Sequence, residues 1–148
     1  MDFIVEVAIM SANNGARATP EQMRRQHIFV VNGSAAFLDV VRELLQDEQY
    51  NVTTTNFVPL TFKQIETAQP SLLIIDLIHG ERAGWDLLAE LRHEAATREI
   101  PVILASTSKQ LLEKAETERV IWGGDRYLLK PFSLDELLQA IQGLVGAA

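Results

Sequence analysis

The sequence contains no cysteine, which excludes disulfide bonds, zinc–thiolate sites and thiol catalysis. Its three histidines, His27, His79 and His93, are scattered and do not have the spacing typical of metal ligands. The glycines form no GxGxxG, Walker or GxSxG motif. The usual signatures of dinucleotide-binding, nucleotide-hydrolysing and serine-hydrolase sites are therefore missing.

Long apolar runs and an excess of basic residues are also missing. No run approaches the roughly 20 residues that cross a bilayer, and the apolar segment 3–10 carries Glu6 and lacks a basic start, so it does not resemble a signal peptide. The net charge of −7 arises from residues 27–148, because acids and bases balance in residues 1–26. We therefore expect a cytoplasmic protein that binds neither membrane nor nucleic acid.

The composition is that of one ordinary globular domain, with 148 residues, 47% of them hydrophobic and 22% charged. Turn residues at 11–15 and 19–20 interrupt any regular element near the start. Residues 1–26 are accordingly predicted to form an N-terminal tail, extended or disordered, ahead of a domain at 27–148. The alternative is that apolar residues within 3–9 form a strand that docks on a sheet edge or on a neighbouring molecule.

From His27 onward, short apolar or β-branched runs alternate with segments of helical periodicity. The runs predict strands near 27–31, 51–55, 72–75, 101–105 and 125–129. The periodic segments predict helices near 34–48, 59–68, 84–95, 108–121 and 133–145. Five strands alternating with five helices through short connections predict an α/β fold, with a parallel sheet between two layers of helices.

Local signals add detail to two of these helices. Ser34 is predicted to cap the first helix, and Ser133 with Glu136 forms a capping-box pattern at the start of the last. The apolar face predicted for the first helix consists of Phe37, Val40, Val41, Leu44 and Leu45.

Three polar residues each follow an apolar strand directly: Asp76, Ser106 and Lys130. Asp76 taken alone is equally consistent with the start of a loop. In a parallel α/β sheet, however, the carboxyl ends of the strands share one edge, and chemistry gathers there. A carboxylate, a hydroxyl and an ammonium group are therefore expected to converge.

With these residues in view, the chain from about 27 to 146 resembles the receiver domain of two-component response regulators. The resemblance implies a flavodoxin-like three-layer sandwich with strand order 2-1-3-4-5. It also implies that Asp76 accepts a phosphoryl group from a histidine kinase, while Ser106 and Lys130, the latter in Lys130-Pro131-Phe132, contact that group. Such a protein works in phosphorelay signal transduction.

Two further positions match the family, and they imply how a signal would leave the domain. Tyr127 corresponds to the switch aromatic, and Gly84 to the glycine eight residues after the phosphoacceptor. The resemblance implies a contact surface made by the last two helices and the strand between them. This surface would bind a signalling partner or a second copy of the chain. Trp122 either belongs to this surface or packs beneath the helix at 108–121.

The match fails at the metal site. Receivers carry two consecutive acids after the first strand, which bind Mg²⁺ with the phosphoacceptor, but this chain has Asn32 and Gly33 there. Mg²⁺ is therefore disfavoured, and no other cofactor is expected. One hypothesis is a working receiver phosphorylated at Asp76. The favoured one is a pseudo-receiver, which keeps the fold but acts by binding, with Asp76 and Lys130 in an ion pair.

An enzyme on the same fold is a remote alternative, and we expect none. A flavodoxin-like enzyme that binds a small ligand would need a hydroxyl-rich phosphate loop after the first strand, but residues 32–35 hold one hydroxyl, that of Ser34. A dehalogenase-type aspartate would need a second aspartate two residues after Asp76, where this chain has Ile78.

Overall fold

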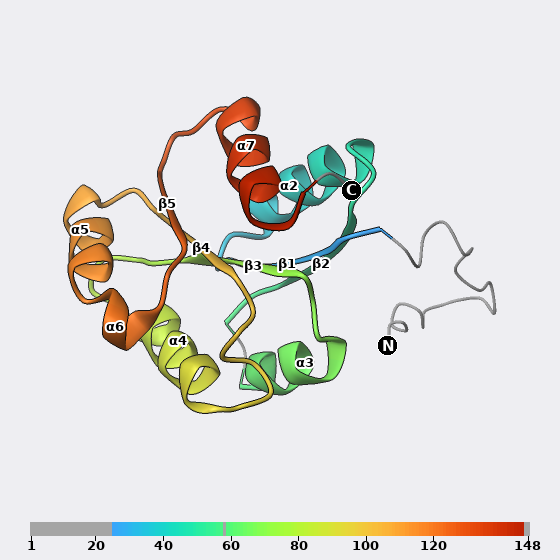
Figure 1. The fold of residues 1–148 in the computed structure, drawn as a ribbon. Helices are drawn as coiled ribbons and strands as arrows, with labels where there is room; N and C mark the ends of the chain where they lie inside the picture. The colour runs from blue at the N-terminus through green and yellow to red at the C-terminus, as the bar shows by residue number, and fades with distance from the viewer. Residues whose placement is uncertain (1–24, 58, 147–148) are drawn as a thin grey trace.

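The computed structural model describes residues 25–57 and 59–146. The predicted tail at 1–26 lies outside this part of the chain except for its last two residues. The sheet consists of five parallel strands, in the order β2-β1-β3-β4-β5 (Figure 1). The strands are β1 (His27–Val31), β2 (Asn51–Thr55), β3 (Leu72–Asp76), β4 (Val102–Ser106) and β5 (Arg126–Leu129). The predicted strand order is thus confirmed.

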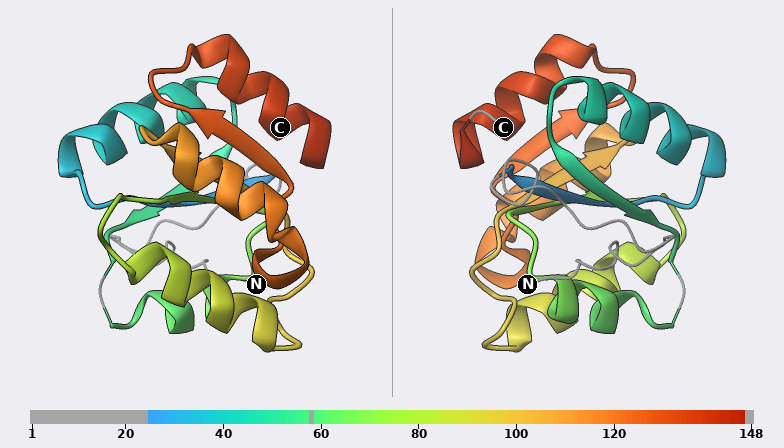
Figure 2. Two further views of the ribbon diagram at one scale, coloured as in Figure 1. Left: turned by 90° about the vertical axis from the view of Figure 1, so that its left-hand side faces the viewer. Right: turned by 90° about the vertical axis from the view of Figure 1, so that its right-hand side faces the viewer.

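Helices cover both faces of the sheet, which confirms the three layers. The described residues form α2 (Ala35–Asp47), α3 (Thr61–Ala68), α4 (Ala83–His93), α5 (Lys109–Thr117), α6 (Arg119–Trp122) and α7 (Leu134–Val145). Figures 1 and 2 show α2 and α7 on one face, and α3, α4 and the α5–α6 pair on the other.

The single helix predicted at 108–121 was wrong, because the chain forms α5 and α6 there. The break lies at Glu118, whose backbone leaves the helical region at φ −101° and ψ 26°. The Ile121 N–H then bonds to the Glu118 carbonyl at 2.8 Å, which closes a tighter turn. Gly123 ends α6 in the left-handed region, at φ 74°. The described residues therefore contain six helices instead of five.

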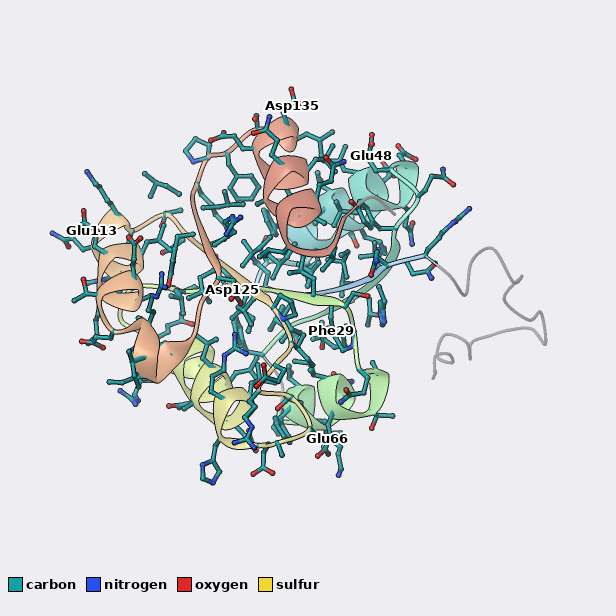
Figure 3. All side chains as sticks on the ribbon, in the orientation of Figure 1. Phe29, Glu48, Glu66, Glu113, Asp125 and Asp135 are labelled. Atoms are coloured by element: carbon teal, nitrogen blue, oxygen red, sulfur yellow. The ribbon has the colours of Figure 1, made fainter. Side chains whose placement is uncertain are left out.

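The core lies between the sheet and its helices, and β3 and β4 are buried along their whole length. Figure 3 shows Phe29 in the interior and the side chains of Glu48, Glu66, Glu113 and Asp135 at the periphery. Within the described residues, no helix is both long enough and apolar enough to span a bilayer.

The capping predictions are confirmed, but the apolar face predicted for α2 wrongly included Val40 and omitted Leu38. The Ser34 hydroxyl accepts the Phe37 N–H, and Ser133 and Glu136 form both bonds of the capping box. The buried residues of α2 are Leu38, Val41 and Leu45, whereas Val40 is 58% exposed. Because apolar residues occur in adjacent pairs along this helix, the sequence is compatible with two different buried faces, and packing against the sheet determines which one is buried.

Candidate functional site

The carboxyl ends of β3, β4 and β5 bring Asp76, Ser106 and Lys130 to one edge of the sheet, as predicted. Asp76 pairs in register with Ala105, and the Lys130 N–H bonds to the Ser106 carbonyl at 2.8 Å. The Lys130 Nζ lies 2.7 Å from Asp76 Oδ1. The ion pair expected for a pseudo-receiver is therefore present, although it does not by itself distinguish one from a working receiver.

The Asp76–Lys130 pair is largely withdrawn from solvent. The two side chains are 9% and 17% exposed. Burial raises the pKa of the Asp76 carboxyl group, because it disfavours the charged form. The hydrogen bond and the charge of Lys130 act in the opposite direction, and Glu81 adds a smaller upward effect. Lys130 thus stabilises the ionised form of Asp76, whereas burial destabilises it.

The ammonium group of Lys130 has a second partner, the ring of Phe37, whose centroid lies 4.2 Å from Nζ. The rings of Phe37 and Phe132 meet edge to face, with centroids 6.5 Å apart. Lys130 is therefore held between a carboxylate and an aromatic face. Sequence reasoning assigned Phe37 only to the core, because spacing along the chain does not indicate which ring lies under Lys130.

Two of the remaining predicted residues, Ser106 and Tyr127, form hydrogen bonds with backbone groups. The buried Ser106 hydroxyl donates to the Leu77 carbonyl at 2.6 Å and accepts the Ser108 N–H at 3.0 Å. The hydroxyl of the half-buried Tyr127 donates to the Gly124 carbonyl at 3.0 Å, and burial raises its pKa. The phosphate-contacting and switching roles of these two residues stay predictions.

The residues that replace the acid pair do not fit a magnesium ion. Asn32 is buried, and its Oδ1 accepts the Ser34 N–H at 2.8 Å, which occupies the one side-chain oxygen at this position. Gly33 offers no side chain. Among the described residues, no group of three or more histidine or acidic side chains is placed to hold a metal. Mg²⁺ is usually held by one or two carboxylates together with water molecules, and here the Asp76 carboxylate is already paired with Lys130.

Beside this edge, the first turn of α4 lies directly against the backbone of Asp76. A Cβ atom at Gly84 would lie 2.8 Å from the Asp76 carbonyl oxygen, so only glycine allows this approach. The next residue, Trp85, contacts Trp122 with ring centroids 4.7 Å apart. The Trp122 Nε1–H donates to Glu118 at 2.8 Å. The half-buried Trp122 thus packs against Trp85 of α4, a contact that neither of its two predicted alternatives named.

Sequence reasoning missed Arg92, near the end of α4. Its guanidinium donates to backbone carbonyls on two other segments: those of Arg98, Ile100, Trp122 and Gly123. It also lies 3.6 Å from the Asp125 carboxylate. Arg92 therefore joins α4 to the chain before β4 and to the turn before β5. An arginine in the last turn of an amphipathic helix gives no sequence signal of this role.

This chain is similar in sequence to a known domain family and to several curated proteins. The model of the response regulator receiver domain matches residues 28–142. The protein PilG of Pseudomonas aeruginosa is 29% identical over 80% of this chain and 86% of its own length. Other curated relatives are longer, and the match covers 49% of the probable transcriptional regulatory protein TcrX of Mycobacterium tuberculosis.

Solved structures show the same fold. The chemotaxis protein CheY4 of Vibrio cholerae has a TM-score of 0.72 at 21% identity, over 81% of this chain and 98% of its own. The receiver domain of the sensor histidine kinase PA1611 of Pseudomonas aeruginosa, solved with a magnesium ion in its active-site cleft, has a TM-score of 0.69 at 22% identity. That match covers 83% of this chain and 99% of the other. With the family model matching more than half of its length, the chain belongs to the response regulator receiver domain family.

Proposed function

We propose that this receiver domain is a pseudo-receiver, which serves two-component signalling as a binding module without magnesium-dependent phosphoryl transfer to Asp76. The observation that carries the proposal is that neither of the two residues after β1 has a carboxylate. Asn32 directs its amide oxygen to the Ser34 N–H, and Gly33 has no side chain. Each carboxylate missing at about 5 Å from a cation forfeits about 3 kcal/mol of gross attraction per unit of cation charge, at an effective dielectric near 20.

In this proposal the domain acts through protein contacts and has no catalytic centre of its own. The candidate surface consists of α5, α6, β5 and α7, where Val120, Ile121 and Leu129 are exposed apolar side chains. A histidine kinase or another signalling protein would bind there, or a second copy of the chain would form a homodimer. We further propose a cytoplasmic location and no contact with nucleic acid, in keeping with the acidic net charge of −7.

The second candidate is a working receiver phosphorylated at Asp76. The specific observation in its favour is the retained group of Asp76, Ser106 and Lys130, with Nζ 2.7 Å from the carboxylate. In that case the Asp76 carboxylate oxygen would attack the phosphorus of a phosphoryl donor, and Lys130 would offset the charge of the acyl phosphate.

Titration with magnesium and beryllofluoride, a mimic of the phosphoryl group, distinguishes the two candidates. The fluorescence of Trp85 and Trp122 reports the response, because Trp85 follows Gly84, whose turn contacts the Asp76 backbone. The pseudo-receiver predicts no saturable change. A saturable change that Asp76→Ala abolishes would instead favour the working receiver.

The variant Asn32→Asp/Gly33→Asp provides the matched gain-of-function test. A Cβ atom at Gly33 would meet nothing closer than Ile78 Cδ1, at 3.9 Å, so an aspartate fits there. We expect the double variant to bind magnesium, measured by calorimetry, and to acquire the fluorescence response. Magnesium binding by the unaltered chain with similar affinity would contradict the proposal.

A further inference from the structure

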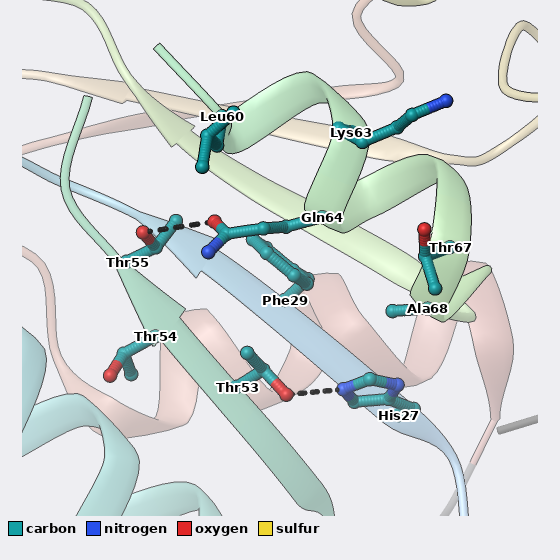
Figure 4. Close-up of a pocket in the computed structure, with 10 residues that line it drawn as sticks. All are labelled: His27, Phe29, Thr53, Thr54, Thr55, Leu60, Lys63, Gln64, Thr67 and Ala68. Carbon is teal, nitrogen blue, oxygen red and sulfur yellow. Dashed lines mark hydrogen bonds between the residues drawn. The ribbon is translucent and has the colours of Figure 1, made fainter. Parts of the chain in front are cut away.

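An open groove of about 350 Å³ lies between β2 and α3 (Figure 4), and β2 is two strands away from β3, which carries Asp76. Ten residues line it: His27, Phe29, Thr53, Thr54, Thr55, Leu60, Lys63, Gln64, Thr67 and Ala68. Phe29 lies at its base, and Leu60 at its rim is 66% exposed. The groove is thus a partly apolar hollow at the margin of an otherwise closely covered sheet.

Two pairs of polar side chains inside the groove bond to one another. His27 Nε2 lies 2.8 Å from Thr53 Oγ1, and the Thr55 hydroxyl lies 3.4 Å from Gln64 Oε1 (Figure 4). Burial lowers the pKa of His27 to about 4, so its ring is neutral near pH 7. Lys63 is the one charged side chain in the lining, and it pairs with Glu66 at 3.0 Å. The rest of the lining is neutral or apolar and suits apolar side chains.

The groove adjoins the outer edge of β2. Among the strands that the structure describes, β2 is the last on its side of the sheet, and all five of its residues are half-buried. The Asn51 N–H bonds to the Gln26 carbonyl at 3.0 Å, and the Thr55 carbonyl accepts the Asn32 N–H at 3.1 Å. In a parallel pair such bonds alternate along the strand, so the backbone groups of Val52 and Thr54 face away from the sheet. Such an edge is a template for another strand.

The same chain carries a segment suited to both features. Residues 3–9, outside the described part of the chain, read Phe-Ile-Val-Glu-Val-Ala-Ile, with apolar residues at every odd position. We propose that this segment adds to the outer edge of β2 as a sixth strand, with Phe3, Val5 and Val7 directed into the groove.

The connection to the domain favours this intramolecular occupant over a separate partner. His27, which lines the groove, is the first residue of β1, so the chain enters the domain at the groove itself. Residues 10–26 span up to roughly 50 Å when extended, which exceeds the roughly 17 Å length of β2. A tether of this kind gives an effective concentration on the order of millimolar. The proposal is independent of the chemistry at Asp76.

Amide hydrogen exchange of the full chain, followed by NMR, tests the proposal. We expect Val5→Asp/Val7→Asp to accelerate exchange at Val52 and Thr54 at least about tenfold, since charges would be forced into the groove. The matched control, Ile4→Asp/Ala8→Asp, adds the same charge on the opposite face of the segment and should change these rates less. The amides of Leu73 and Ile74 in β3 serve as the reference for global stability.

Three outcomes would overturn the proposal. Val52 and Thr54 could exchange equally fast in the unaltered chain and in Val5→Asp/Val7→Asp, in which case the segment does not cover the edge. Equal acceleration by both double variants would exclude the proposed orientation. Protection that rises with protein concentration would show that a second copy supplies the strand.

Discussion

At the scale of single residues, the charge of Asp76 opposes folding. The folded-state pKa of its carboxyl group lies above the ordinary 3.8, chiefly because burial disfavours the ionised form. Its favourable contribution is therefore complete below pH 3.8 and is lost as the pH rises through the folded-state pKa. Asp76→Asn keeps an oxygen acceptor for Lys130 but carries no charge. We expect it to increase the free energy of unfolding at pH 7 by about 1 kcal/mol.

This gain should shrink as the pH falls toward the folded-state pKa of Asp76, where the native carboxyl group takes up a proton. Urea denaturation of both proteins from pH 4 to pH 7 measures the difference. Asp39→Asn is the control, because Asp39 forms an exposed pair with Arg42 and should change stability by less than about 1 kcal/mol. A loss of stability in Asp76→Asn at pH 7 would show that the ion pair outweighs the cost of burial.

His27 has the opposite pH dependence. Burial lowers its pKa from 6.5 to about 4, so the unfolded chain binds a proton across this interval and the folded chain does not. Stability should therefore fall as the pH drops from 6.5 to 4. His27→Gln retains a hydrogen-bonding partner for Thr53 and should reduce that fall by as much as roughly 3 kcal/mol. The exposed His93→Gln should leave the urea denaturation profile unchanged; an equal effect would contradict the assignment.

At the scale of secondary-structure elements, Arg92 holds α4 to its neighbours. Arg92→Ala would leave the carbonyls of Arg98 and Ile100, which precede β4, without their donor, and we expect it to lower the free energy of unfolding by about 2–4 kcal/mol. Arg82→Ala on the same helix is the matched control, because Arg82 is 79% exposed in its pair with Asp86. Similar losses in both variants, measured by urea denaturation, would refute the role of Arg92.

The elements also show what local sequence determines. The residues of β1 and β2 agree with the predicted 27–31 and 51–55, because short β-branched or apolar runs between turn residues specify strands directly. The break at Glu118 was not predictable, since this residue lies in a charged segment without glycine or proline. The prediction for α2 was right for Val41 and Leu45 but included Val40 and left out Leu38, because contact with the sheet decides between these two residues.

At the scale of the whole molecule, stability should not depend on magnesium. Neither Asn32 nor Gly33 carries a carboxylate, and the carboxylate of Asp76 is already paired with Lys130. Its melting temperature should therefore be the same in EDTA and in excess magnesium chloride. Asn32→Asp/Gly33→Asp adds two carboxylates beside Asp76, so it should melt a few degrees lower in EDTA and recover with magnesium. A magnesium-dependent melting temperature of the unaltered chain would contradict the pseudo-receiver.

Topology explains why part of the site could be predicted. Parallel strands end at one edge, so Asp76, Ser106 and Lys130 had to converge wherever the strand assignment was right. The orientation of their side chains could not be predicted in the same way. Ser106 bonds to the Leu77 carbonyl and Phe37 lies under Lys130 because of packing between distant segments, which leaves no local pattern in the sequence.

The contact at Gly84 has a mechanical consequence. The first turn of α4 rests on the backbone of Asp76 with no side chain between them, and Trp85 continues this contact to Trp122. A displacement of α4 by a bound protein would thus push on the end of β3 itself, without any phosphoryl group to start the movement. Strain at α6 would in this way reach the end of β3 through Trp122, Trp85 and Gly84.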